Sequence, residues 1–447
     1  MPTLALSMIV RNCENYIREC LESVRGCVDE IQIADTGSSD STICVASEMG
    51  ARVIRIPWEN DFARARNLAL QEVHTDWVLV LDADEQLDPS ASHCLPGLMN
   101  QPEVRGYLTS IRNYLLSTQD LVWDRPAVPN DASYERAKQY PAYAEHQNVR
   151  LFRRSPEILF VGRIHETVGT TIERSGGKVS PCPVLIHHFG LVEDPDTRAQ
   201  KNRLYRKMGR QKLLEMPENA QAHFELGLLE FEGFHEYQEA LRLFHRACEL
   251  NPKLSVSWFF AGVANLKAGQ PEEALRCLKN AGARPLVFEA QGDAFYALGR
   301  FDQARRAYLR AFDTVKLPPE LESKIGLAEV RSGRVMSGMA RLRKAVERDA
   351  GAPQVHDRLV TALVWLNQLG EAAEAAEKKI ASVAPDPQAY LRAAVIRAQQ
   401  EKWEESSQIL RRGLAQFPHH QGLERVFAEV LPHTSGQSVR CGQDYPP

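Results

Sequence analysis

The stretch that decides the fold is Trp77-Val78-Leu79-Val80-Leu81-Asp82-Ala83-Asp84-Glu85. Its first five residues are apolar, which is typical of a strand buried on both faces of an α/β sheet. Three carboxylates follow, and the Asp-x-Asp spacing places Asp82 and Asp84 on the same side of an extended chain. Two like charges so close raise each other's pKa unless a cation lies with them. The stretch predicts a central strand ending at a cation site; a solvated acidic turn is the alternative.

The type of ligand narrows the choice of cation. Carboxylate oxygens with few other ligands nearby suit Mg²⁺ or Mn²⁺. These cations usually complete their coordination with water and with the phosphates of a substrate. We therefore expect a divalent cation as cofactor and a phosphate-bearing substrate beside it.

Composition bounds the class of protein. The 447 residues are 44% hydrophobic and 25% charged, as in a soluble globular protein of two or three domains. A net charge of −4 gives no reason to expect nucleic acid as a partner. The nine cysteines form no C-x-x-C pair, which suits a reducing compartment. No apolar run approaches the roughly 18 residues of a transmembrane segment, and residues 4–10 lack a basic leader, so we expect a cytoplasmic protein.

Apolar and amphipathic segments alternate before the Asp-x-Asp stretch. Strands are expected over residues 4–10, 31–34, 53–56 and 77–82, and helices over 14–24, 41–49 and 61–73. Strands that alternate with helices predict a parallel sheet built of right-handed crossovers.

Two acidic turns follow strands of this sheet, one at Asp35 and one at Asp82 and Asp84. Ligands of open α/β sheets bind along the edge formed by the carboxyl ends of the strands. The coincidence predicts a nucleotide diphosphate site there. The chain lacks G-x-G-x-x-G and G-x-x-x-x-G-K-[ST] at these turns, so neither a dinucleotide fold nor a P-loop is supported.

Four motifs in residues 4–190 together resemble family 2 glycosyltransferases of the GT-A fold, a Rossmann-like and mostly parallel α/β architecture. The motifs are Ser7-Met8-Ile9-Val10-Arg11-Asn12, Asp35-Thr36-Gly37-Ser38-Ser39-Asp40, Phe62-Ala63-Arg64-Ala65-Arg66-Asn67 and Leu81-Asp82-Ala83-Asp84-Glu85. The chain is most similar to the branch in which helical repeats follow this domain. That branch includes peptide S-glycosyltransferases similar to the sublancin enzyme.

The resemblance implies roles for residues at the sheet edge. Asp35 would accept a hydrogen bond from the base of a nucleotide sugar, Asp82 would contact the ribose, and Asp84 would bind the metal. Arg66 or Arg64 would offset the diphosphate charge, unless both lie on a solvated helix face. Two further residues, Asn67 as a donor and Asn12 on the same rim, complete the expected nucleotide-sugar site.

The segment Phe160-Val161-Gly162-Arg163-Ile164-His165-Glu166 begins like H-E-x-x-H, but Gly169 stands at the fifth position and excludes a zincin helix. The resemblance places a catalytic carboxylate here. Glu166 is therefore the candidate general base, with His165 orienting it or contacting the donor. An ion pair between Glu166 and Arg163 at a strand end is the structural alternative.

The adjacent His187 and His188 lie on a predicted strand that ends the domain, so they point to opposite faces and at most one reaches the site. The resemblance implies a histidine near here that binds the metal or the diphosphate, and His188 is the slightly favoured candidate. Between residues 107 and 152, strands are expected over 107–115 and 148–152. The Tyr- and Pro-rich piece 123–143 between them is expected to be an acceptor-side loop.

Small residues recur in the second half of the chain at intervals of 30 to 36 residues. They are Ala240, Ala274, Ala304 and Ala340, and Gly227, Gly262, Gly292 and Gly326. Small residues at this period let paired helices approach closely and predict an all-α tetratricopeptide (TPR) solenoid of five to six repeats. The expected domains are 1–195 (glycosyltransferase), 196–216 (helical linker), 217–432 (repeats) and 433–447 (loose tail).

The sequence therefore predicts a metal-dependent, inverting glycosyltransferase that uses a nucleotide-sugar donor. The concave repeat surface would hold a peptide or protein acceptor, or would pair two copies of the chain. One alternative is a non-catalytic scaffold with a degenerate first domain. Others are an enzyme acting on lipid-linked or cell-envelope saccharide and a nucleotidyltransferase, although the last should carry a Gly-rich basic loop after its first strand, which is absent.

Overall fold

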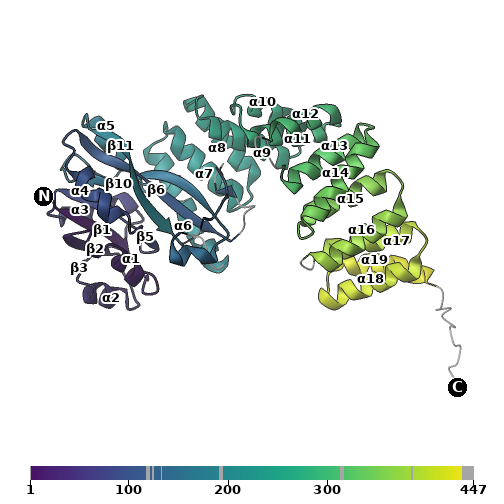
Figure 1. Cartoon of the computed structure of the whole chain (residues 1–447), viewed down its shortest axis with the longest axis horizontal. Coiled ribbons are helices and arrows are strands. Elements are labelled where there is room, and N and C mark those ends of the chain that lie inside the picture. Colours follow the sequence, from purple (N-terminus) through teal and green to yellow (C-terminus); the bar gives the residue numbers. More distant parts are fainter. Residues whose placement is uncertain are drawn as a thin grey trace, which may run out of the picture. The chain divides into compact units, whose positions relative to one another are not determined.

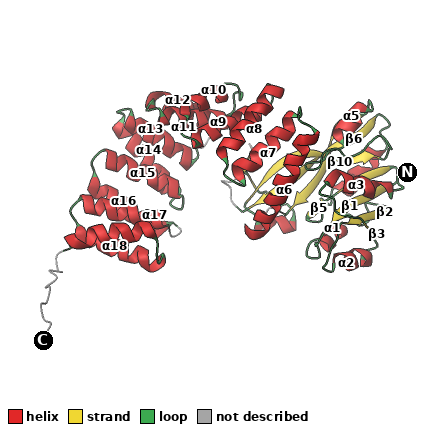
Figure 2. Cartoon of the chain, turned by 180° about the vertical axis from the view of Figure 1, so that it is seen from behind, coloured by secondary structure: helices red, strands yellow, loops and turns green. Residues whose placement is uncertain are grey.

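The computed structural model describes residues 2–116, 121–122, 125–131, 133–190, 195–312, 317–383 and 386–434. The chain divides into two compact units, Met1–Val256 and Ser257–Pro447. All strands of the described residues lie in the first unit, and the second unit is helical (Figure 2). The predicted order, an α/β domain followed by a helical repeat region, is confirmed.

The first unit is built on one large mixed sheet with the strand order β3-β2-β1-β4-β10-β6-β11-β5 (Figure 1). Its strands are β1 (Leu4–Val10), β2 (Glu30–Asp35), β3 (Arg52–Arg55), β4 (Trp77–Val80), β5 (Glu85–Leu87), β6 (Val104–Leu115), β9 (Val128–Pro129), β10 (Ala142–Arg153) and β11 (Lys178–His188). Strands β1 to β4 run parallel to one another, as predicted. Strand β10 runs antiparallel to both β4 and β6. The parallel half therefore ends at β4, the strand that carries the acidic turn.

Alternate side chains of the central strands enter two separate cores. Leu79 packs in one core with helices α1 (Ile17–Ser23) and α4 (Ala91–Met99). Val78 packs in the other core with α3 (Phe62–Gln71) and α5 (Gly169–Arg174). Helix α2 (Thr42–Glu48) contributes Ala46 to the first core. Because β4 is buried on both faces, its continuous apolar run is explained.

The structure departs from the sequence expectation in the second half of the sheet domain. Strand β5 and helices α4 and α5 were not expected, and β10 is longer than the predicted strand 148–152. The expected loop 123–143 includes residues 123, 124 and 132, which lie outside the described residues. Its described part contains β9, a 3₁₀ helix (Glu135–Gln139), the start of β10, and β8 (Arg125–Pro126), which pairs with β7 (Leu121–Val122).

Three helices follow the sheet within the first unit: α6 (Pro195–Glu215), α7 (Ala220–Glu232) and α8 (Tyr237–Leu250). The expected linker 196–216 is thus almost entirely one helix. Gly227 of α7 lies against α8, because a Cβ added there would stand 2.8 Å from the ring of Phe244. The close helix approach predicted at this glycine is confirmed.

The helices after α8 are α9 (Ser255–Lys267), α10 (Pro271–Leu278), α11 (Pro285–Ala297), α12 (Phe301–Arg310), α13 (Pro319–Arg331), α14 (Val335–Arg348), α15 (Pro353–Trp365), α16 (Leu369–Ser382), α17 (Pro387–Gln399), α18 (Trp403–Gln416) and α19 (Gln421–Val430). A Cβ at Gly262 would lie 2.6 Å from Leu278, and one at Gly326 would lie 2.9 Å from the carbonyl of Gly338. Most of the predicted loose tail, residues 435–447, lies outside the described residues. Among the described helices, none has both the length and the apolar character that a bilayer span needs.

Candidate functional site

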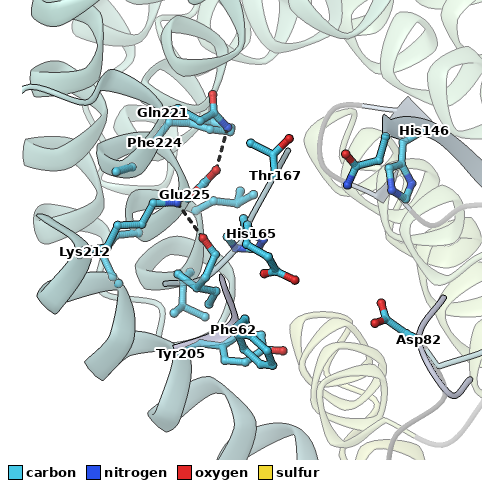
Figure 3. A pocket seen from close by; sticks show the side chains of 18 of the residues that line it. Phe62, Asp82, His146, His165, Thr167, Tyr205, Lys212, Gln221, Phe224 and Glu225 are labelled. Carbon is cyan, nitrogen blue, oxygen red and sulfur yellow. Dashed lines mark hydrogen bonds and ion pairs between the residues drawn. The ribbon is translucent and has the colours of Figure 1, made fainter. Parts of the chain in front are cut away.

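A cavity of about 1190 Å³ opens beyond the carboxyl end of β4. One side is formed by the turn after β4 and by β10, and the other by α6, α7 and the loop 160–167, all within the first unit. Among the predicted site residues, the cavity is lined by Arg66, Asp82, Asp84, His165, Glu166 and His188. Figure 3 shows Asp82 across the cavity from Lys212 and Glu225, with His165 and Thr167 between them.

Arg66 joins two of the predicted functional carboxylates. Its Nη2 donates to Asp82 Oδ1 at 2.7 Å, and its Nε donates to Glu166 Oε1 at 2.5 Å. The Arg66 side chain is only 7% exposed and that of Glu166 12%. The structural alternative for this arginine, a solvated helix face, therefore does not apply. Glu166 pairs with Arg66 and not with Arg163, which bonds Glu215.

A second arginine in this cluster, Arg150 of β10, belongs to none of the sequence motifs. Its Nη2 donates to Asp82 Oδ2 at 3.1 Å and to Glu85 Oε1 at 2.8 Å. Burial by itself raises the pKa of Asp82, but the positive charges of Arg66 and Arg150 outweigh it and hold that pKa well below its ordinary value. Burial raises the pKa of Glu85 to about 7, although the charge of Arg150 opposes the shift. The Asp82 carboxylate is thus fixed in its ionised form.

Asp84 and His188 face each other on the other side of this network. Asp84 Oδ2 lies 3.4 Å from His188 Nε2, and His188 Nδ1 lies 2.7 Å from Asn113 Oδ1. Since the amide oxygen accepts a hydrogen bond, the proton of a neutral His188 belongs on Nδ1, and Nε2 keeps a lone pair directed at Asp84. Burial lowers the pKa of His188, but Asp84 outweighs burial and raises that pKa, because its charge and a hydrogen bond from Nε2–H stabilise the protonated ring.

His187 lies on the opposite face of β11, as the strand alternation predicts. Its Nδ1 lies 2.7 Å from the hydroxyl of Tyr114 and its Nε2 lies 3.0 Å from Asp88 Oδ2. The side chain is fully buried and its pKa is lowered, chiefly by burial. His187 is therefore a hydrogen-bonded core histidine.

Asp84 and His188 are the residues of this cluster that could bind a divalent cation. The described residues contain no group of three or more His, Cys, Asp or Glu side chains that could hold a metal ion. Both oxygens of Asp82 are held by arginines. A cation here would therefore have two protein ligands, Asp84 and His188, and would need phosphate oxygens or water for the remainder. This donor set fits Mg²⁺ or Mn²⁺ bound together with a substrate diphosphate.

Two predicted residues of α3 lie outside the cavity. Arg64 is 60% exposed and forms an ion pair with Glu59 at 3.1 Å. Asn67 donates to the carbonyl of Phe160 at 2.9 Å and accepts from its amide at 2.8 Å. Asn67 thus holds the start of the loop that carries Glu166.

The other two, Asp35 and Asn12, stabilise neighbouring turns. The Asp35 carboxylate is 1% exposed and accepts from the amides of Gly37 and Ser38 at 3.0 and 3.1 Å. Asn12, with φ 51°, accepts from the amide of Ser39 at 2.8 Å. The carboxyl ends of β1 and β2 are therefore tied together, but neither side chain lines the cavity that contains Asp84.

An α/β sheet with carboxylates beyond a strand end, facing an open cavity, is the arrangement in which open α/β sheets bind ligands such as nucleotides. Residues 6–158 match the model of glycosyl transferase family 2, and residues 289–353 match a tetratricopeptide repeat model. The chain thus carries a family 2 glycosyltransferase domain followed by tetratricopeptide repeats.

Three relatives are similar to different lengths of the chain. A TPR repeat-containing protein of Synechococcus elongatus is 30% identical over 311 residues, which are 68% of this chain and 66% of that protein. The lipopolysaccharide core biosynthesis glycosyltransferase LpsC of Rhizobium meliloti is 36% identical over 26% of this chain and 45% of its own. The SPbeta prophage-derived glycosyltransferase SunS of Bacillus subtilis is 25% identical over 37% of this chain and 34% of its own. The chain thus spans less than half of either named glycosyltransferase.

Proposed function

We propose that the chain is a metal-dependent, inverting glycosyltransferase that transfers a sugar from a nucleotide-sugar donor to an acceptor. The observation that carries the proposal is the meeting of Asp82, Asp84, Arg66 and Glu166 at one end of a large cavity. A degenerate scaffold has no need for buried, mutually paired charges, because such a cluster is costly to desolvate.

On the donor side, Asp84 and His188 would hold Mg²⁺ or Mn²⁺ together with the diphosphate. A cation bound there supplies charge neutralisation for the departing nucleotide diphosphate. Arg66 and Arg150 are buried cations within the same cluster, and both line the cavity. Arg66 would therefore share the diphosphate charge while keeping Asp82 in place.

On the acceptor side, Glu166 would act as general base. It removes the proton from the acceptor nucleophile, which bonds to the anomeric carbon from the face opposite the diphosphate. The bond between the anomeric carbon and the diphosphate oxygen breaks, and the nucleotide diphosphate leaves with that electron pair. A diphosphate that attracts Arg66 would weaken the bond from Arg66 Nε to Glu166 Oε1 and leave that oxygen free to accept the proton of the nucleophile.

Binding of donor to the full chain tests the metal site. Calorimetry with UDP-glucose, UDP-N-acetylglucosamine and GDP-mannose, with Mn²⁺ and then with excess EDTA, should show one donor that binds only with the metal. Asp84→Asn should weaken this binding by tenfold or more, because the loss of a charged ligand costs 1.4 kcal/mol or more. Asp302→Asn, at an exposed aspartate of the second unit, is the control. Metal-independent binding in the wild type would contradict the proposal.

Transfer tests the base. Glu166→Gln should bind the donor normally and lose about 10²- to 10⁴-fold in transfer rate, the usual contribution of a general base. Nucleotide diphosphate release is followed by a coupled assay. If Glu166→Gln transfers at the wild-type rate, the base lies elsewhere.

The class of acceptor that receives the sugar is a further part of the proposal. Tetratricopeptide surfaces usually bind polypeptide, which favours a peptide or protein acceptor or partner. The name of LpsC favours a saccharide of the lipopolysaccharide core instead. Incubation with a donor, followed by mass spectrometry of a peptide library and of core saccharides, separates these acceptors. Light scattering tests the further proposal that the repeats pair two copies of the chain.

A further inference from the structure

Lys212 of α6 is a buried cation that no step of the proposed reaction uses. Its side chain is 8% exposed. The ammonium donates to the backbone carbonyl of Ile164 at 2.7 Å and to Glu225 Oε2 of α7 at 2.8 Å. A buried ammonium is costly unless such partners satisfy it. Lys212 thus binds one helix to a second helix and to the loop that carries Glu166.

The backbone of the loop 160–167 forms a tight turn with one residue in a left-handed conformation. Val161 and Thr167 exchange backbone hydrogen bonds at 3.0 and 3.1 Å, which closes the segment into a tight hairpin. At its tip, His165 has φ 52°, a left-handed conformation that non-glycine residues adopt only when their surroundings hold them. Ile164, whose carbonyl Lys212 binds, immediately precedes this residue. The ammonium therefore acts where the backbone is under strain.

A second tie joins the loop to the same helix. Arg163 Nε donates to both carboxylate oxygens of Glu215 at 2.7 and 2.9 Å. This pair is more exposed than Lys212, since Glu215 is 40% exposed. Exposed ion pairs contribute little to stability, so the buried bond from Lys212 is the stronger of the two ties.

We propose that Lys212 is a positioning residue of the glycosyltransferase site, through which the first helix after the sheet holds Glu166 in its working position. The inference rests on the proposed role of Glu166. Loss of the ammonium leaves the Ile164 carbonyl without its donor and lets the backbone at His165 relax. Glu166 is only two residues further on, and a displacement of about 1 Å at a reacting group can cost 10²-fold in rate.

Amide hydrogen exchange of the full chain, without any substrate, tests whether the bond from Lys212 to the Ile164 carbonyl holds the loop. Lys212→Met keeps the aliphatic stem and removes the donor, and should speed exchange of the segment 160–168 by about tenfold or more. Glu225→Gln keeps the bond to Ile164 and should leave that segment within about threefold of wild type. Lys207→Met, at an exposed lysine of the same helix, is the matched control. Unchanged exchange in Lys212→Met would overturn the proposal, as would equal loosening in Lys207→Met.

Kinetics test the positioning role. The assay uses whichever of UDP-glucose, UDP-N-acetylglucosamine and GDP-mannose the wild type turns over. With that donor, Lys212→Met should lower kcat by about 10- to 100-fold. The donor KM should stay within about threefold, because His188 lies in β11 and the backbone of Asp84 is bonded to Phe189, away from the loop. A loosened loop with unchanged kcat would overturn the role. Absence of wild-type transfer with every donor would defeat the proposed function, while the exchange result would still decide whether Lys212 anchors the loop.

Discussion

Arg64 and Arg66 are two residues apart on α3, and their surroundings differ completely. The Arg64 side chain is 60% exposed beside Glu59, whereas that of Arg66 is 7% exposed between Asp82 and Glu166. Residues two apart on a helix point about 200° away from each other, so only one of the pair can face the sheet edge. The sequence could name both arginines but could not choose between them.

This contrast gives a prediction for stability. Arg66→Met leaves the carboxylates of Asp82 and Glu166 without their shared partner, and should lower the free energy of unfolding by about 3–5 kcal/mol. Arg64→Met removes only an exposed ion pair and should change it by less than about 1 kcal/mol. Urea denaturation of both variants measures the difference. A loss below about 1 kcal/mol in Arg66→Met would mean that the paired charges contribute little to folding.

Residues that act across long sequence separations could not be found from local patterns. Arg150 reaches Asp82 from 68 positions away, and Lys212 reaches Ile164 from 48. The one sequence signal for Arg150 is that a basic residue stands between Val149 and Leu151 in an apolar strand. No feature of the sequence distinguishes Lys212, because it lies in a helix rich in basic residues. Motifs reveal residues that are close in sequence, while buried ion pairs depend on the finished fold.

At the scale of elements, prediction succeeded where the pattern is local. The run 77–81 marks β4 as buried on both faces, and β1 to β3 and α3 are found within one or two residues of their expected bounds. The sequence does not predict β5, because Glu85 follows Asp82 and Asp84 in a run of carboxylates, whereas in the structure its side chain is only 2% exposed. The partner of this buried carboxylate is Arg150, which comes from a distant strand.

The glycines at helix crossings give a prediction at this scale. A Cβ at Gly338 of α14 would stand 2.6 Å from the carbonyl of Gly326 and 2.7 Å from the amide of Val330. Backbone atoms cannot move aside as a side chain can, so Gly338→Ala should cost about 1–3 kcal/mol of unfolding free energy. Gly370→Ala is the control, since its nearest neighbour stands at 3.9 Å and a helical alanine gains about 0.5–1 kcal/mol. Thermal melts that shift alike in the two variants would contradict this account.

At the scale of the whole molecule, sequence and packing divide the chain at different places. Composition changes near residue 195 and the repeat pattern begins near 217, but the first compact unit extends to Val256. The reason is that helical periodicity reports the form of a segment and not what it packs against. Helices α6 and α7 have the pattern of the helical half, yet they form one side of the cavity beside β10.

This division predicts where the chain can be cut. A chain of residues 1–256 keeps Lys212 with Ile164, Glu215 with Arg163 and the edge contact between Phe62 and Tyr205, and should unfold in one cooperative transition. A chain of residues 1–195 loses all three and should melt at least 5 °C lower, because about 1 kcal/mol shifts the melting temperature of such a domain by 2–4 °C. Circular dichroism melts compare residues 1–256 with residues 1–195. Mn²⁺-dependent binding of the nucleotide sugar that the full chain binds is a second measure. If residues 1–195 melt and bind like 1–256, helices α6 to α8 are dispensable to the site, and the boundary that sequence places near 195 is the functional one.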